Sequence, residues 1–445
     1  MLDFLLTRTP LFYLTQSLWR DEAFSVLVAE KPVSFFFQKL TFEPPLYYIM
    51  LHVWMRIFGN GEIAVRTLSL TGVTLAAVIV IFWAERIYRD KFIQWFLPLF
   101  FFLNPMITYY AFEVRTYGWF IFFATLSLYA YGSNKWKLYA FASVLGFYTH
   151  TYFVFLILVT ALHFLIWNGS RLLRNISFKK LRNDAYVKSA LLTGIFILPW
   201  MFNIAVQSGK LKSSWYYPVD LQLIKSVLGN MFIGYEGTPW FLWPYTAVLS
   251  AFLAATFLLA FKYTKDRKRT SMFMLMVFVP LTLVIGISFI KPLYVNRYLI
   301  PVTIAEIFLI TEALAAVKSR IMRTFIGLVL LAGISAFNLW YPDKHPKLPI
   351  RDTVAVVNRL AKPEDLIYAT SPLIYFETVY YSPDRSRVYL YNPSSSPFPW
   401  YVGDVIFSED RMVTDLPIFP KKAFLIQEKG DYSMSYTVYT PAGTR

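Results

Sequence analysis

Long apolar runs follow one another along most of this chain, and they constrain its fold more than any other feature. Several contain 17 residues or more, enough to cross roughly 30 Å of hydrocarbon at about 1.5 Å per helical residue. Hydrophobic residues make up 57% of the sequence and charged residues only 16%, a balance that no ordinary soluble domain has. The sequence therefore predicts a polytopic α-helical membrane protein with about 10–11 transmembrane helices.

The expected spans can be placed from these runs. The first apolar stretch, residues 1–18, is interrupted by Arg8 and Pro10, so we expect a degenerate span or the remainder of one. Two surface helices should follow, near 22–40 and 45–58, because Pro44-Pro45 stops one helix and suits the first turn of the next. The full spans are then expected at 66–85, 92–109, 116–132, 136–149, 151–167, 189–206, 240–261, 271–290, 298–316 and 323–341.

The net charge of +16 is a topology signal rather than a nucleic-acid site. Residues 342–445 carry twelve Lys/Arg and twelve Asp/Glu, so the excess lies in the membrane part. Nineteen Lys/Arg occur in five connections, at 86–91, 133–137, 168–188, 262–270 and 317–323. The opposite connections, at 110–115, 150, 207–239 and 291–297, hold six. By the positive-inside rule the first set is cytoplasmic, and the second set should share the outer face with the C-terminal tail.

The tail is expected to form a domain of its own. Residues 342–445 should fold as a small extracytoplasmic α/β domain beside a membrane module at 1–341, because their many aromatic residues argue against disorder. The expected elements are a helix at 350–360 and strands at 365–370, 387–392 and 423–427. The chain has no cysteine, which excludes disulfides and thiolate metal sites.

Three carboxylates, Asp21, Glu22 and Glu43, lie in the surface loop at 20–65 of this otherwise apolar sequence. Adjacent acids cost self-repulsion and desolvation, so membrane proteins keep them where they are hydrated, paired or used. The pair could deprotonate a hydroxyl, or it could only cap and solvate the helix that starts near Ala23. The residues alone leave both interpretations open.

Other polar residues are expected on the same face. Glu113 and Arg115 could form an interfacial ion pair, and His150 could be no more than a hydrogen-bonded corner between two helices. Arg66, Arg115 and Arg297 come from separate elements. They could surround one phosphate, which the guanidinium fork fits well, or they could be snorkelling anchors.

Five motifs in order resemble those of the polyprenol-phosphate-sugar-dependent glycosyltransferases of the GT-C fold. They are Trp19-Arg-Asp21-Glu22-Ala-Phe-Ser, Pro44-Pro45-Leu-Tyr-Tyr, Gly61-Glu62-Ile-Ala-Val-Arg66, Tyr110-Ala-Phe-Glu113-Val-Arg115-Thr-Tyr117 and Asn296-Arg297-Tyr298-Leu-Ile-Pro301. The chain looks most like glycosyltransferase family 39, which includes the protein O-mannosyltransferases and relatives of the lipid A aminoarabinose transferase. The resemblance covers residues 8–310. It also implies that a first transmembrane helix, which the family has before the stretch at 8–19, is missing or truncated here.

The resemblance implies an enzyme that moves a sugar from a polyprenyl-phosphate donor to a hydroxyl of a lipid, glycan or protein acceptor, by single displacement with inversion. Asp21 matches the catalytic base, and Glu22 matches an acid that assists it or orients the acceptor. The donor-phosphate candidates are Arg297, Arg115, Arg66 and Tyr298. The acceptor or supporting candidates are Glu43, Glu113, His150 and Tyr117.

Other possibilities remain at this point. A divalent metal could bind near Asp21, Glu22 and Glu113, but no metal site or other cofactor is assigned. A flippase or transporter of lipid-linked saccharides should carry charges in mid-span, where only Glu306 and Glu312 stand out. A polymerase or ligase of lipid-linked glycans would share the layout of the charges. The expected location is the inner or plasma membrane, with the site outside, in contact with membrane lipids and without nucleic acid.

Overall fold

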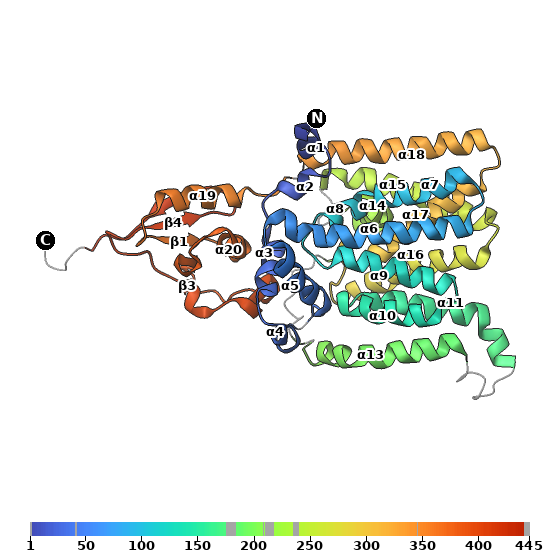
Figure 1. Ribbon diagram of the computed structural model, residues 1–445, viewed down its shortest axis with the longest axis horizontal. Helices are drawn as coiled ribbons and strands as arrows, with labels where there is room; N and C mark the ends of the chain where they lie inside the picture. Colours follow the sequence, from blue (N-terminus) through green and yellow to red (C-terminus); the bar gives the residue numbers. More distant parts are fainter. Residues whose placement is uncertain are drawn as a thin grey trace.

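The computed structural model describes residues 2–40, 42–174, 184–207, 209, 218–234, 240–344 and 346–439. A bundle of long helices occupies one end of the molecule and a small sheet the other. The short helices α3, α4 and α5 lie between them (Figure 1). The site residues considered below gather at this junction.

A helix occupies each of the ten expected spans. Six helices are long and apolar enough to cross a membrane alone, and a bent pair could make a seventh span. The chain is therefore a multi-span membrane protein, as predicted, although α9, α10 and the described part of α11 are shorter than that test requires. The helices are α6 (Glu62–Ile87), α7 (Lys91–Phe102), α8 (Pro105–Ala111), α9 (Tyr117–Gly132), α10 (Trp136–Thr149), α11 (Phe153–Arg174), α13 (Ala185–Gln207), α15 (Trp243–Tyr263), α16 (Arg267–Ser288), α17 (Ile300–Ala316) and α18 (Arg320–Trp340).

The span expected at 92–109 is bent by 56° between α7 and α8. Asn104 caps α8 by accepting from the backbone N–H of Ile107 at 3.2 Å, and Pro105 occupies its first turn. The Asn104 amide also donates to the carbonyl of Phe232 at 2.8 Å. This second bond ties the bend to α14 (Leu221–Ile233).

The prediction of one surface helix at 22–40 is wrong. The chain forms α3 (Arg20–Ala29) and α4 (Val33–Gln38) instead, with Pro32 at the N-cap of α4. Proline has no N–H to donate and disfavours the helical conformation in the residue before it, so one helix cannot continue through it. The second expected surface helix is α5 (Leu46–Phe58), which directly follows Pro44-Pro45.

Three of the basic connections meet at the end of the bundle remote from the sheet (Figure 1). Arg269 donates to Glu312 at 2.7 Å, and the hydroxyl of Tyr88 donates to the same carboxylate at 3.1 Å. Arg323 pairs with Asp90 nearby. These contacts join the connections that follow α6, α15 and α17, so Glu312 serves an ion-pair network. Residues 175–183 of the connection expected at 168–188 lie outside the described residues.

The C-terminal domain (residues 350–439) is built on a five-stranded sheet with the order β3-β2-β1-β4-β5. β1 pairs in parallel with β2 and β4, β2 with β3 in parallel, and β4 with β5 antiparallel. The short strands β3 and β5 and the helix α20 were not expected. The elements are α19 (Ile350–Leu360), β1 (Leu366–Ala369), α20 (Pro372–Tyr381), β2 (Val388–Tyr391), β3 (Met412–Val413), β4 (Ala423–Ile426) and β5 (Tyr432–Ser435).

This domain packs directly on α3. The rings of Phe24 and Phe376 lie 5.6 Å apart, and Gly403, at φ 129°, faces Phe24 so closely that an added Cβ would lie 2.4 Å from its ring. The backbone N–H of Leu18 donates to the hydroxyl of Tyr381 at 2.6 Å. The segment leading into α3 is thus held by the C-terminal domain.

Candidate active site

The two adjacent acids occupy the first turn of α3. The carboxylate of Glu22 accepts from the backbone N–H of Trp19 at 3.2 Å, which is one half of a capping box and fixes the start of the helix. Successive helical residues point about 100° apart. Asp21 and Glu22 therefore face different surroundings, although they are neighbours in the sequence.

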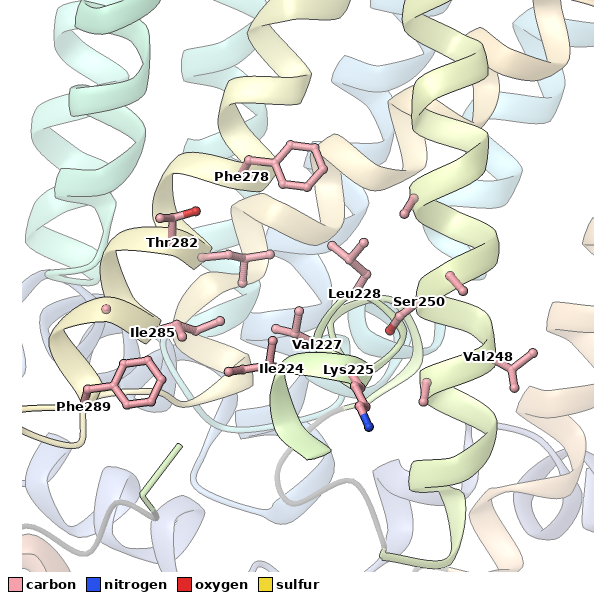
Figure 2. A pocket seen from close by; sticks show the side chains of 15 residues that line it. Ile224, Lys225, Val227, Leu228, Val248, Ser250, Phe278, Thr282, Ile285 and Phe289 are labelled. Atoms are coloured by element: carbon pink, nitrogen blue, oxygen red, sulfur yellow. The ribbon is translucent and has the colours of Figure 1, made fainter. Parts of the chain in front are cut away.

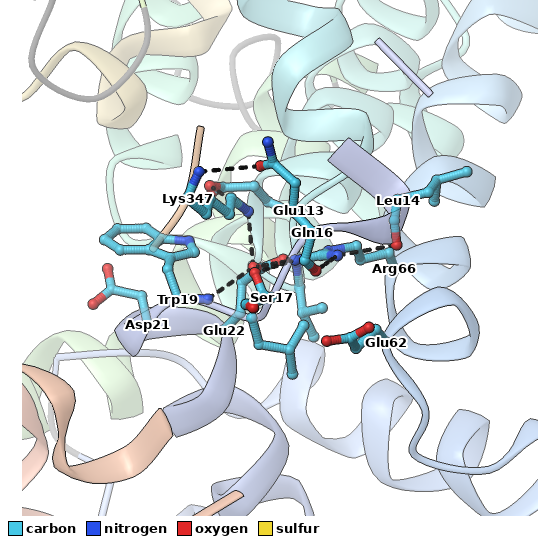
Figure 3. Close-up of polar contacts among 12 residues, drawn as sticks. Leu14, Gln16, Ser17, Trp19, Asp21, Glu22, Glu62, Arg66, Glu113 and Lys347 are labelled. Atoms are coloured by element: carbon cyan, nitrogen blue, oxygen red, sulfur yellow. Dashed lines mark hydrogen bonds and ion pairs between the residues drawn. The ribbon is translucent and has the colours of Figure 1, made fainter. Parts of the chain in front are cut away.

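Glu22 belongs to a cluster that we call the enclosed cluster: Glu22, Arg66, Glu113 and Lys347. Two nitrogens of Arg66 donate to the two oxygens of Glu22, at 2.9 and 2.7 Å. The Lys347 ammonium lies 2.8 Å from Glu22 and 3.6 Å from Glu113. The side chains of Glu22 and Arg66 are fully buried, and Asp21 points away from this cluster (Figure 3).

All five N–H groups of Arg66 are used. Besides Glu22, they reach the backbone carbonyls of Leu14 (3.0 Å), Gln16 (2.6 Å) and Ser17 (3.1 Å). Arg66 thus fixes the chain that leads into α3. It has no donor left for a phosphate in this arrangement, so we leave it out of the phosphate site proposed below.

Glu22 is equally saturated. In addition to the contacts above, it accepts from the backbone N–H of Val114 at 3.1 Å. Burial alone would raise the pKa of Glu22, but the charges of Arg66 and Lys347 outweigh burial and lower that pKa. The Glu22 carboxylate is therefore an anion whose two oxygens both accept hydrogen bonds. These contacts favour a structural role for Glu22 over a role in proton transfer.

Asp21 belongs to a second group that we call the half-open cluster: Asp21, Arg20, Arg115, Glu43 and Arg297. One oxygen of Asp21 accepts from Arg20 at 2.9 Å, and the other lies 3.9 Å from Arg115 and 3.8 Å from Arg297. Arg115 also donates to Glu43 at 2.9 Å. The side chain of Glu43 is 34% exposed and that of Asp21 13%, so this cluster reaches the surface.

The half-open cluster has three cations and two carboxylates, an excess of one positive charge. Burial would raise the pKa of Asp21, but the charges of Arg20 and the two other arginines hold that pKa well below its usual range. Asp21 lies farther from Arg115 and Arg297 than it does from Arg20.

Aromatic side chains and His150 form one wall beside Arg297. The Tyr117 hydroxyl accepts from Arg297 at 2.7 Å, and the guanidinium carbon lies 5.5 Å from the centre of the Tyr298 ring. His150 stacks on Phe120 with ring centres 4.7 Å apart. Burial, together with the charges of Arg115 and Arg297, lowers the pKa of His150 to about 3. His150 is thus a neutral part of this wall.

Two glycines hold the turn at 113–115 against α6. An added Cβ on Gly72 would lie 2.7 Å from the carbonyl oxygen of Gly118, and one on Gly118 would lie 2.5 Å from that of Ser69. The helices α6 and α9 therefore touch backbone to backbone. The Ser69 hydroxyl donates to the carbonyl of Arg115 at 3.2 Å, which fixes the residue that faces Asp21.

The structure brings all ten predicted site residues to this junction. Seven of them are divided between the two clusters, and Tyr117, His150 and Tyr298 form the wall beside Arg297. Sequence reasoning missed Lys347, which has no motif around it, and Tyr48, whose hydroxyl donates to Glu43. Tyr48 lies in the Pro-Pro-Leu-Tyr-Tyr motif, so a signal for it was present. Among the described residues, no three His, Cys, Asp or Glu are grouped to hold a metal ion.

A large apolar cavity of about 870 Å³ opens between α14, α15 and α16. Lys225 lies at its edge, and apolar side chains such as Leu228, Phe278 and Ile285 line it (Figure 2). The same helix α14 also contacts the segment that carries Arg297, because the hydroxyl of Tyr294 lies 3.7 Å from the sulfur of Met231. The cavity and the half-open cluster are thus linked through α14.

Comparison with known proteins gives a structural match only. No protein-family model and no curated protein sequence matches the chain. ArnT from Cupriavidus metallidurans in the apo state is similar, with a TM-score of 0.58 and 11% identity over 92% of this chain and 89% of that chain. Its structure bound to undecaprenyl phosphate gives a TM-score of 0.59 and 12% identity over 94% and 91%. The fold is of the GT-C type. Identities this low establish the fold alone.

Proposed function

We propose that this protein is an integral membrane glycosyltransferase, related to family 39, that transfers a sugar from a polyprenyl-phosphate donor to an acceptor hydroxyl. One observation carries the proposal. Asp21, Arg115 and Arg297 come from three separate elements, and the Asp21 carboxylate lies less than 4 Å from each guanidinium. They do so in the fold of ArnT, one structure of which is bound to undecaprenyl phosphate.

Arg115 and Arg297 would bind the donor phosphate. Each guanidinium presents a planar fork that fits two phosphate oxygens. The hydroxyl of Tyr117 and the ring of Tyr298 hold Arg297 in place, so little conformational freedom is lost on binding. The excess positive charge of the half-open cluster favours an anion here.

Asp21 would act as the base. It takes the proton of the acceptor hydroxyl while the acceptor oxygen forms a bond to C1 of the sugar and the bond from C1 to the phosphate oxygen breaks. The phosphate leaves with the bonding electrons, and the two arginines offset its growing charge. Such preorganised contacts are worth roughly 3–4 kcal/mol each. One displacement of this kind inverts the configuration at C1.

Donor binding would also activate the base. In the free protein the arginines hold the pKa of Asp21 low, which makes it a weak proton acceptor. A phosphate that binds Arg115 and Arg297 cancels part of this field and adds a negative charge nearby, and both changes raise the pKa of Asp21. Asp21 therefore becomes a stronger base only when the donor is in place.

The apolar cavity beside α14 would hold the first isoprene units of the donor. Its lining is mostly apolar, and it lies between α14, α15 and α16. Lys225 at its edge lies where a phosphate-bearing lipid would pass. The sugar and phosphate would then extend past α14 toward Arg297.

Purified protein in lipid nanodiscs, incubated with a panel of polyprenyl-phosphate sugars and candidate acceptors, tests the proposal. We expect release of polyprenyl phosphate together with a glycosylated acceptor of inverted anomeric configuration. A glycan rather than a single sugar on the acceptor would identify a polymerase or ligase. Movement of intact donor across vesicle membranes without any transfer would refute the enzyme and support a flippase.

The orientation of the site is a separate proposal. We place the half-open cluster and the C-terminal domain on the extracytoplasmic face, because the basic connections gather at the opposite end of the bundle. Two exposed lysines offer a matched test in this cysteine-free chain. Lys421→Cys should react with an impermeant thiol reagent on intact cells, and Lys265→Cys only after lysis. The reverse pattern would place the active site in the cytoplasm.

A further inference from the structure

Lys347 is a buried cation in the segment that leads from α18 into the C-terminal domain. Its side chain is only 5% exposed. The ammonium lies 2.8 Å from Glu22 and 3.6 Å from Glu113, and 5.9 Å from the centre of the Tyr109 ring. A lysine is rarely enclosed to this extent unless its charge is compensated.

The charges of the enclosed cluster balance only when Lys347 is present. Two carboxylates, Glu22 and Glu113, face two cations, Arg66 and Lys347. Arg66 cannot compensate for a missing partner, because its five N–H groups are already used. Removing Lys347 would therefore leave one net negative charge buried in the cluster, an unfavourable state.

The two carboxylates belong to the segments that carry the half-open cluster. Glu22 follows Asp21 in α3, and Glu113 lies two residues before Arg115. Glu22 also accepts from the N–H of Val114, so the two segments meet at this cluster. The Lys347 ammonium lies between them and contacts both carboxylates (Figure 3).

We propose that Lys347 is a positioning residue of the active site, through which the C-terminal segment sets the distance between Asp21 and Arg115. The proposal rests on the function proposed above. It gives the C-terminal domain a role in the reaction, because Lys347 lies three residues before α19 and the domain itself packs on α3.

A second contact of the same segment provides a matched control. Arg351 pairs with Glu62 at 2.6 Å and donates to the carbonyl of Thr15 at 3.1 Å. It therefore also holds the C-terminal domain on the membrane part, but it touches neither cluster in these contacts. If Lys347 only held the C-terminal domain in place, replacing Lys347 and replacing Arg351 would have equal effects on kcat.

The test compares Lys347→Met and Arg351→Met by thermal unfolding, by binding of undecaprenyl phosphate and by turnover at saturating donor. We expect Lys347→Met to lower kcat by about 10- to 100-fold, the scale on which small displacements of reacting groups act. Arg351→Met should reduce thermal stability but keep kcat per folded molecule within about twofold. Equal kcat in Lys347→Met and the wild type, or an equal loss in both variants, would overturn the proposal.

A charge-balanced variant separates positioning from simple loss of folding. Glu113→Gln removes one carboxylate, so Lys347→Met with Glu113→Gln again has one cation and one anion in the enclosed cluster. We expect the double variant to regain at least about tenfold in kcat over Lys347→Met alone, about 1.4 kcal/mol in activation free energy. Glu113→Gln alone completes the double-mutant cycle from which the coupling is calculated. Additive losses would refute the role of Lys347. A wild-type protein that neither transfers sugar nor binds undecaprenyl phosphate would overturn this inference and the proposed function together.

Discussion

The enclosed and half-open clusters contain the same kinds of residue at the same end of the bundle, yet they are built for different tasks. In the enclosed cluster, Glu22 accepts five hydrogen bonds at 2.7–3.2 Å and the formal charges cancel. In the half-open cluster, Asp21 lies 3.8 and 3.9 Å from two arginines and the charges do not cancel. Saturation gives rigidity, whereas the longer distances and the unbalanced charge leave capacity for a substrate anion.

A step of one residue along α3, about 100° around the helix, separates these tasks. Because Asp21 and Glu22 are adjacent on α3, any movement of the enclosed cluster moves the proposed base as well. The saturated acid thus acts as the support of the reactive one. This difference predicts that replacements in the enclosed cluster lower stability, and also activity where they displace Asp21 or Arg115. Replacements in the half-open cluster should lower activity at constant stability.

The largest effect should come from Arg66→Met. The change leaves Glu22 without its main partner and three backbone carbonyls without donors, all in a buried place. Breaking a buried pair from one side costs about 3–5 kcal/mol, so we expect poor expression and a strongly lowered midpoint of thermal unfolding in detergent. The exposed Arg56 on α5 offers a control, since Arg56→Met should unfold like the wild type. A stable Arg66→Met protein would contradict the structural role of the enclosed cluster.

Asp21→Asn should give the largest effect on chemistry alone. The amide is nearly isosteric and keeps its hydrogen-bonding capacity, so folding and binding of undecaprenyl phosphate should survive. It cannot take the acceptor proton, and turnover should fall by roughly 10²-fold or more. Glu22→Gln should instead lower thermal stability more than turnover per folded molecule. Near-normal turnover of Asp21→Asn at saturating donor would leave Asp21 only its ion pairs with the arginines.

Much of this arrangement could be predicted from the sequence. A bilayer permits few spanning structures, so apolar runs in the sequence locate the helices. The number of Lys and Arg residues in each connection then predicts on which side of the membrane each helix end lies. The same count also placed the segments that carry Asp21, Arg115 and Arg297 on one face, although it did not predict their contacts. The division into two clusters could not be predicted, because it depends on how α3 is rotated against α6 and on a partner, Lys347, that is 325 residues away in the sequence.

Glu306 shows another property that could not be predicted from the sequence, namely the surroundings of a charged residue within a span. It stands out as a charge in mid-span, and the structure places it fully buried in α17. Its carboxylate oxygens make no hydrogen bond within the part of the chain that the structure describes. The neighbouring exception, Glu312, has Tyr88 and Arg269 as partners. A charged residue in a span can therefore be recognised from the sequence, but its surroundings cannot.

Arg297→Lys should produce an intermediate effect. Lysine keeps the positive charge but loses the planar fork and the bond from Nε to the Tyr117 hydroxyl. We expect binding of undecaprenyl phosphate to weaken about tenfold, corresponding to about 1.4 kcal/mol. Arg269→Lys makes the same change in the network at the opposite end of the bundle and should leave binding unaltered. Equal affinities of Arg297→Lys and the wild type would reduce Arg297 to an anchor.

The smallest effect concerns a third buried carboxylate, Glu377 in α20, which has no cationic partner of its own at ion-pair distance within the described residues. One of its oxygens makes no hydrogen bond there, and the other contact is with the backbone of Arg20. Burial raises the pKa of Glu377 to about 8, the opposite of the shift at Glu22. The two acids differ in whether a cation is buried with them.

This contrast has a consequence for stability. Between its unfolded pKa of about 4.5 and its folded pKa of about 8, the folded protein binds more protons at Glu377 than the unfolded chain does. The free energy of unfolding should therefore fall as the pH rises through this window. Residue 377 cannot titrate in Glu377→Gln, so this variant should lose the part of the pH dependence of unfolding free energy that comes from Glu377. At pH 8 its melting temperature should be about a few degrees above that of the wild type. Glu409→Gln, at an exposed glutamate of the same domain, should keep the wild-type slope. Identical slopes in all three proteins between pH 5 and 8.5 would show that Glu377 is ionised, and would remove the contrast with Glu22.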